Sequence, residues 1–153
     1  MTPFMTRVAD LVGASDEDRA DLETPMPNTR ISQRIATGTG ADRQVALRAY
    51  AEQLVCEANA VLTSHHESGD HTLSLYDETL PSELAFNVGY AGRAARVSTT
   101  FEDGTAYGRL VGDGFESDLP QELEGPDALP DLIVRLLLES GTVSGATSGP
   151  AFA

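Results

Sequence analysis

Apolar residues recur at helical spacing in three segments of the chain. The first segment, residues 3–12, carries one apolar stripe and is followed by Gly13, a residue that favours helix termination. The longest segment runs from about Asp42 to Leu62, and its apolar face is wide enough that a sheet or another helix must cover it. The last segment follows Asp127, a favourable helix cap, and its apolar positions are Leu129, Leu132, Ile133, Leu136 and Leu137.

After residue 71 the apolar positions recur every second residue, which is typical of β-strands. Four strands are predicted, at 72–76, 84–90, 95–102 and 105–111. Asp103-Gly104 joins the last two strands, and this dipeptide favours a tight hairpin that fixes their register. The hairpin places Val97 opposite Leu110 and leaves the last strand at an exposed edge of the sheet. Residues 29–36 fit a short helix and a strand equally well, and both interpretations stay open.

The four strands form an antiparallel meander with one apolar and one polar face, and the apolar face needs cover. The sequence therefore predicts an α+β two-layer sandwich, in which the long helix and the C-terminal helix lie on one face of the meander, preceded by short N-terminal helices. We expect a single α+β domain over residues 41–140. A helical or irregular extension over residues 1–40 precedes it, and a flexible tail of small residues over 141–153 follows it.

Charge is the most informative bulk property of the chain. Its 153 residues include 24 acidic and 10 basic side chains, for a net charge of −14, and every basic residue is an arginine. Such a surface repels itself in dilute buffer, whereas molar salt, with a Debye length of about 3 Å, screens the repulsion. This composition is typical of an acidic, halophilic protein; a GC-rich genome, which also favours arginine over lysine, is the alternative. The negative charge argues against nucleic acid and anionic membranes as partners.

Two further features bear on where the protein works. No apolar run approaches the roughly 18 residues that span a bilayer, and the N-terminus lacks the pattern of a signal peptide. The single cysteine, Cys56, cannot form an internal disulfide, which fits a reducing compartment. We therefore expect a cytoplasmic protein.

All three histidines lie in the sequence SHHESGDH, residues 64–71. The side chains that this segment offers to a metal ion are His65, His66, Glu67, Asp70 and His71. They make the segment a candidate site of a metal-binding enzyme or sensor, although their spacing matches no common zinc clamp. Helical spacing turns Cys56 away from them and places it on a shoulder of small residues beside the apolar stripe, where we expect it to be packed. The favoured interpretation is a connection between helix and strand, without metal or cofactor.

A further alternative is a nucleotide or small-molecule site at Thr37–Gly40, just before the long helix. Backbone N–H groups at a helix start can donate to a phosphate, and Arg30 and Arg34 add positive charge nearby. The stretch follows no clear strand and contains no phosphate-binding lysine, so an ordinary helix start explains it as well. No catalytic motif has the required spacing in this chain, so no catalytic residue is assigned and an enzyme is not favoured.

The polar face of the sheet is the remaining candidate, as a surface for a partner. Its largest side chains are Tyr76, Asn87, Arg96, Tyr107 and Arg109. Tyrosine and arginine are enriched at the centres of protein–protein contacts, although they are also common on solvated strands. We therefore expect a non-enzymatic module that binds a protein partner or a second copy of itself. It would use this polar face or a groove between sheet and helices.

Overall fold

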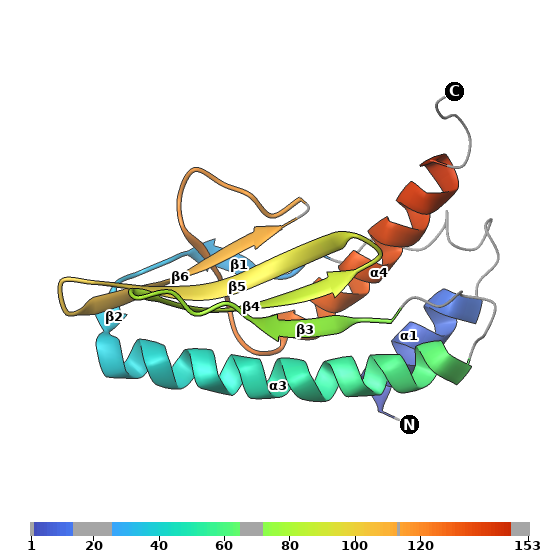
Figure 1. The fold of residues 1–153 in the computed structure, drawn as a ribbon, viewed down its shortest axis with the longest axis horizontal. Helices are drawn as coiled ribbons and strands as arrows, with labels where there is room; N and C mark the ends of the chain where they lie inside the picture. The colour runs from blue at the N-terminus through green and yellow to red at the C-terminus, as the bar shows by residue number, and fades with distance from the viewer. Residues whose placement is uncertain (1, 14–25, 65–71, 113, 148–153) are drawn as a thin grey trace.

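The structure is a computed structural model that describes residues 2–13, 26–64, 72–112 and 114–147 (Figure 1). Within these ranges it contains three helices, α1 (Pro3–Gly13), α3 (Thr37–Ser64) and α4 (Ala128–Thr147). They accompany a five-stranded antiparallel sheet and a separate two-stranded one, which confirms the predicted α+β class. None of the described helices combines the length and the apolar character needed to cross a bilayer.

The five-stranded sheet has the order β2-β6-β5-β4-β3. Its strands are β2 (Ile35–Ala36), β3 (Ser74–Asp77), β4 (Glu83–Tyr90), β5 (Arg93–Glu102) and β6 (Thr105–Gly112). Two-residue turns at Ala91-Gly92 and Asp103-Gly104 join β4 to β5 and β5 to β6, and all four turn residues have positive φ. The predicted register is confirmed, since Val97 lies opposite Leu110.

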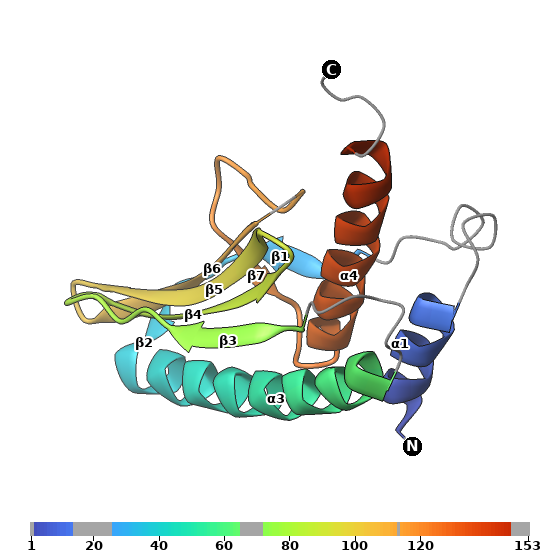
Figure 2. The ribbon, with the colours of Figure 1, turned by 45° about the vertical axis from the view of Figure 1, so that its right-hand side comes forward.

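The helices cover one face of the sheet. Figures 1 and 2 show α3 running along the sheet, α1 beside the C-terminal end of α3, and α4 rising past the ends of the strands. The most deeply buried large side chains come from all three helices and from the strands above them, and include Val8, Leu54, Leu62, Phe86, Val88, Leu129, Leu132, Ile133 and Leu136. These layers match the predicted sandwich.

Residues before position 41 contribute to the same core and sheet. Phe4 and Val8 of α1 are buried in the core, and β2 pairs with the first two residues of β6. At the other end of the chain, α4 continues to Thr147, beyond residue 140, where the sequence places the start of a tail. The flexibility of that tail stays a prediction.

Several elements differ from those predicted, among them β7 (Gln121–Leu123), which the sequence did not predict. The long helix begins at Thr37 rather than near Asp42, and its first turns lie close to the sheet because Gly40 has no side chain. Residues 29–36 form two short strands, β1 (Thr29–Ile31) and β2, instead of one element. Because β2 pairs with the start of β6, that strand is not the fully exposed edge that the hairpin suggested.

The two-stranded sheet consists of β1 and β7 (Gln121–Leu123), and a buried carboxylate fixes it to the rest of the fold. The side chain of Glu122, in β7, is only 6% exposed. Its Oε1 lies 2.7 Å from Nη2 of Arg30 in β1, and its Oε2 lies 2.6 Å from Nη2 of Arg43 in α3. The ion pairs therefore hold both strands of the ribbon against the first half of α3.

Candidate functional site

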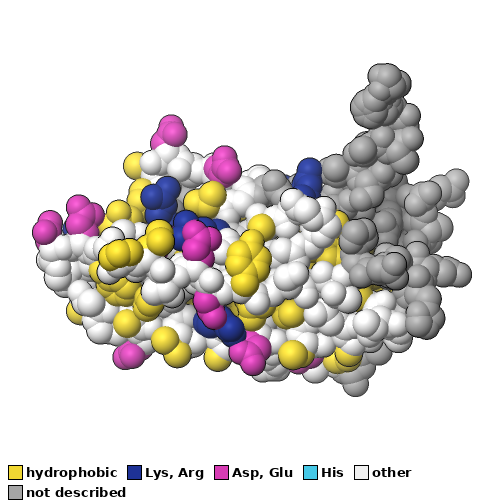
Figure 3. Space-filling view, in the orientation of Figure 1, with side chains coloured by type: hydrophobic (Ala, Val, Ile, Leu, Met, Phe, Trp, Pro, Cys, Tyr) yellow, Lys and Arg dark blue, Asp and Glu magenta, His cyan; other side chains and the backbone are white. Residues whose placement is uncertain are grey.

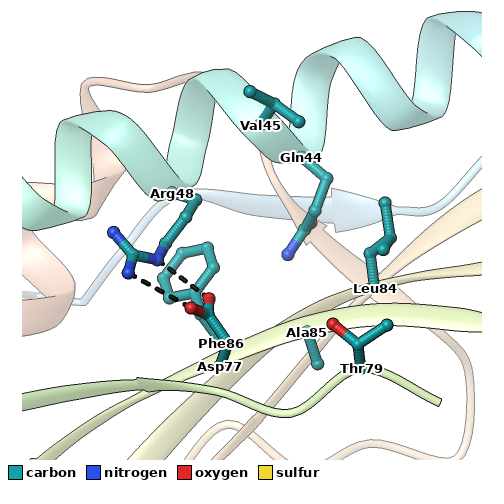
Figure 4. Close-up of a pocket in the computed structure, with 8 residues that line it drawn as sticks. All are labelled: Gln44, Val45, Arg48, Asp77, Thr79, Leu84, Ala85 and Phe86. Carbon is teal, nitrogen blue, oxygen red and sulfur yellow. Dashed lines mark hydrogen bonds and ion pairs between the residues drawn. The ribbon is translucent and has the colours of Figure 1, made fainter.

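A groove opens between the first half of α3 and the β3–β4 hairpin (Figure 4). Its volume is about 150 Å³, close to that of a cavity that holds one benzene molecule. The lining residues are Gln44, Val45, Arg48, Asp77, Thr79, Leu84, Ala85 and Phe86. We call this feature the edge groove, since β3 is the last strand at this side of the sheet.

Apolar side chains dominate the opening of the edge groove. Phe86 is fully buried behind it, Leu84 is half-buried at its rim, and Val45 on α3 is 63% exposed. Leu80, at the tip of the β3–β4 hairpin, is also exposed. Figure 3 shows apolar side chains among a few charged ones on the face where β3 runs above α3. Large exposed side chains beside an apolar hollow are typical of surfaces that another molecule covers.

One end of the edge groove is closed by a two-pronged ion pair, which Figure 4 marks with dashed lines. Nε of Arg48 donates to Oδ1 of Asp77 at 2.9 Å, and Nη2 donates to Oδ2 at 3.2 Å. The hydrogen bonds from Arg48 lower the pKa of the Asp77 carboxyl below its ordinary value. Those to Asp77 and Glu52 raise the pKa of Arg48 in turn. Both charges are therefore compensated, which leaves the apolar side chains as the unengaged part of the groove lining.

The polar side chain at the floor of the edge groove is also engaged. Gln44 is buried; its amide nitrogen donates to the carbonyl of Val97 at 3.0 Å, and its amide oxygen accepts from the hydroxyl of Thr99 at 2.9 Å. These bonds hold the first half of α3 at a fixed distance from β5. Seven of the eight lining residues lie in α3, β3 and β4, and Thr79 lies in the connection between the two strands.

The predicted partner residues of the polar sheet face share one face but differ in their surroundings. Tyr76, Asn87 and Arg96 lie side by side across β3, β4 and β5. Asn87 is buried and donates to Glu78 at 3.2 Å. Arg96 pairs with Glu78 at 3.4 Å and with Glu83 at 3.2 Å, so its charge is compensated. Tyr76, which is 49% exposed, is the member of this row that a partner can reach.

The other two predicted residues lie further along the same face, on β6. The guanidinium of Arg34 lies 5.5 Å from the centre of the Tyr107 ring, so a cation already covers this ring. Arg109 lies opposite Ser98 and is exposed, with no ion pair or hydrogen bond to its side chain among the described residues. Residues 84–101 contain two arginines and no acidic residue, but Glu78 and Glu83 approach this face from just outside that stretch and make it less basic.

Residues 65–71 lie outside the described residues, so the metal hypothesis for His65, His66 and His71 stays a prediction. Within the described ranges, no group of three or more histidine, cysteine or acidic side chains is arranged to hold a metal ion.

The placement of Cys56 was wrong. Its side chain is exposed on α3, as are those of Val45, Ala49 and Ala60. At about 100° per residue these positions lie opposite the buried stripe rather than beside it. The buried positions of α3 are Gly40, Gln44, Ala51, Leu54, Val55, Ala58, Val61 and Leu62.

The stretch Thr37–Gly40 is the first turn of α3 and not a loop. Gly40 packs against β6, where a Cβ would lie 2.6 Å from Cβ of Ala106, so its glycine serves close packing. Arg34 lies 3.4 Å from Glu102 and 3.0 Å from the Thr105 hydroxyl, while Arg30 faces Glu122. The nearby arginines therefore face carboxylates of the protein itself.

Sequence reasoning missed the residues that form the edge groove. A valine at position 45, opposite the buried stripe of a predicted helix, was the available signal. Leu84 belongs to a correctly predicted strand, but no local pattern shows that α3 leaves its side chain partly uncovered. Comparison with known proteins finds no family model, no curated protein and no solved structure that matches this chain.

Proposed function

We propose that this protein is a non-enzymatic binding module that holds an apolar side chain of a protein partner in the edge groove. The observation that carries this proposal is that the groove lining includes an exposed valine, Val45 on α3, and a half-buried leucine, Leu84 on β4. A partner that covers them removes apolar surface from water, at about 25 cal/mol per Å². The ionic and amide groups that line the groove already have partners, so the contact that remains to be made is apolar.

The polar sheet face takes a supporting role in this proposal. Tyr76 stands on β3, the same strand that borders the groove, and can extend the contact around the edge of the sheet. Asn87 and Arg96 are engaged with glutamates, so they are weaker candidates for direct contact. Arg109 and Tyr107 lie three strands away from β3 and define a separate surface.

Selection from a displayed library of random peptides tests the proposal. We expect enriched peptides to share an aliphatic or aromatic residue and to bind the Val45→Arg variant at least tenfold more weakly. Ala60→Arg is the matched control, because it adds the same charge to another exposed position of α3 outside the groove lining. Its binding should equal that of the unchanged protein.

Two outcomes contradict the edge groove as the binding site. One is that no peptide is enriched, or that enriched peptides bind the Val45→Arg variant normally. The other is that binding is lost in the double variant Tyr107→Ala with Arg109→Ala and kept in Val45→Arg, which places the site on the polar sheet face.

We also propose that the protein works in the cytoplasm of a salt-rich cell. The net charge of −14, the absence of lysine and the single cysteine support this proposal. In such a cell an apolar contact keeps its strength, because salt screens charge pairs but not the burial of apolar surface.

A further inference from the structure

The outer edge of β3 has backbone groups that point away from the sheet. In an antiparallel pair, residues alternate between those that bond to the neighbouring strand and those that face outward. Leu80 and Glu83 exchange both backbone hydrogen bonds, and the N–H of Glu78 donates to the carbonyl of Ala85. Along β3 and on to Leu80 the bonded residues are therefore every second one, Leu80, Glu78 and Tyr76, and the backbone of Tyr76 bonds to β4. The N–H and C=O groups of Leu75 and Asp77, which lie between them, face outward.

An amide side chain already occupies the start of this edge. The N–H of Leu73 donates to Oδ1 of Asn59 at 2.7 Å, and Nδ2 of Asn59 donates to the carbonyl of Leu73 at 3.0 Å. Asn59 thus offers Leu73 the same donor and acceptor that a neighbouring strand would offer. No described residue does the same for the outward groups of Leu75 and Asp77.

The open part of the edge lies between two hollows of the surface. On the side of α3 it borders the edge groove. On the opposite side, Tyr76 stands next to a shallow hollow of about 270 Å³, whose floor is formed by the small residues Ser74, Gly89 and Ala94. Figure 1 shows β3 at the rim of the sheet above α3. Alternate side chains of an added strand would therefore enter the groove and the polar face in turn.

The charges around this edge define the chemistry of its occupant. Glu52, Asp77, Glu78 and Glu83 lie near it, and two arginines, Arg48 and Arg96, pair with them. A third arginine, Arg93, lines the hollow beside Tyr76, so one negative charge remains in excess, which favours a basic partner. Because Glu78 lies on the polar face and the edge groove on the other, the basic residue must directly precede or follow the aliphatic one.

We propose that an extended segment of a partner protein adds to the outer edge of β3 as a sixth strand, with an aliphatic side chain in the edge groove and an adjacent arginine or lysine beside Glu78. This inference rests on the proposed function for the groove contact and adds the backbone pairing and the charge. Each pair of backbone hydrogen bonds contributes only modestly to the binding free energy in water. The apolar contact in the groove therefore supplies most of the affinity, and the backbone pairing at the edge fixes the orientation of the segment.

The test uses a synthetic peptide, acetyl-Thr-Arg-Val-Arg-Val-Arg-Thr-amide, with the full chain at the lowest KCl concentration at which the protein stays folded. Two derivatives carry backbone N-methyl groups, one on the valines and the other on the arginines. A strand bonds through alternate residues, so we expect one derivative to bind at least tenfold more weakly and the other to bind as the parent does. Loss at the valines indicates antiparallel addition, and loss at the arginines indicates parallel addition.

Two control peptides separate strand addition from simple attraction to an acidic protein. One has the same composition with its three arginines placed first, and the other carries glutamates in place of the arginines. Both should bind at least tenfold more weakly than the parent. Equal binding of the rearranged peptide, or equal effects of the two methylation patterns, would overturn the inference. In either case the peptide is then tested against the Val45→Arg variant. If it binds this variant more weakly than the unchanged protein, the groove proposal survives. If it binds both proteins equally, both proposals fail.

Amide hydrogen exchange gives a second, independent readout on the protein. The N–H groups of Leu75 and Asp77 should exchange at least tenfold more slowly when the parent peptide is bound. That of Tyr76, which already bonds within the sheet, should change little. Unchanged exchange at Leu75 and Asp77 under saturating peptide would contradict pairing at this edge.

Discussion

Gly40 shows how a single missing side chain sets the distance between α3 and the sheet. A Cβ at this position would lie 2.6 Å from Cβ of Ala106 and 3.2 Å from Cγ2 of Thr99. We expect Gly40→Ala to lower the free energy of unfolding by about 1–3 kcal/mol, because α3 must move away from β6. Gly38→Ala, where no atom lies within 4 Å, should leave stability unchanged or slightly raised. Equal urea midpoints for the two variants would contradict this account.

The Arg48–Asp77 pair predicts a measurable titration. Because Arg48 holds the pKa of Asp77 below its ordinary value, the ionised carboxylate is favoured in the folded protein. Its contribution to stability is complete above the ordinary carboxyl pKa and is lost as the pH falls through the lowered one. In an NMR titration of the Asp77 carboxyl, Arg48→Met should move the pKa back up. Arg109→Met, on the other face of the sheet, should not.

At the scale of elements, the β1–β7 ribbon depends on one buried charge. Glu122→Gln keeps the size of the side chain but removes the charge that Arg30 and Arg43 share. Removing one partner of a buried ion pair is destabilising, and since both arginines are partly exposed we expect a loss of about 2 kcal/mol. Glu124→Gln, two residues further along and exposed, is the control and should change the free energy of unfolding by less than about 0.5 kcal/mol. Similar losses in both variants would argue against this role of Glu122.

The elements that the sequence predicts correctly are those with a local periodic signal. The stripe of α3 and the alternation of β4 to β6 extend over eight or more residues, and the Asp103-Gly104 turn fixes a register by itself. The strands β1, β2 and β7 have two or three residues each, too few for a period. Their pairing partners lie about 70 to 90 residues away in the chain, so only the folded core selects them.

The candidate site was predicted only in part for the same physical reason. A groove between sheet and helices was expected, and Tyr76 was assigned to the partner surface. Val45 and Leu84 line the groove because of the way α3 lies on the sheet, where Gly40 packs against β6 and Gln44 bonds to β5. Asn59 likewise serves the edge of β3 through a contact across 14 residues. No local pattern distinguishes Gln44 and Asn59 from ordinary solvated polar residues.

At the scale of the whole molecule, the arginines are largely used inside the fold. At least six of the ten lie within 4.0 Å of a carboxylate: Arg7, Arg30, Arg34, Arg43, Arg48 and Arg96. With 24 acidic residues, 14 negative charges remain in excess even if every arginine is paired. Salt therefore has two opposing effects, since it weakens the specific pairs and screens the general repulsion.

The screening of the general repulsion should dominate, because each exposed ion pair contributes little to stability while the excess charge acts over the whole surface. We expect the melting temperature to rise by about 10 °C between 0.2 and 3 M KCl, which corresponds to roughly 3 kcal/mol for a chain of this size. The triple variant Glu116→Gln, Asp118→Asn and Glu124→Gln removes three exposed negative charges, so the net charge changes from −14 to −11. It should melt higher than the unchanged protein at low KCl and match it at high KCl. A melting temperature that does not respond to KCl, or a variant that gains nothing at low salt, would show that charge repulsion does not limit the stability of this fold.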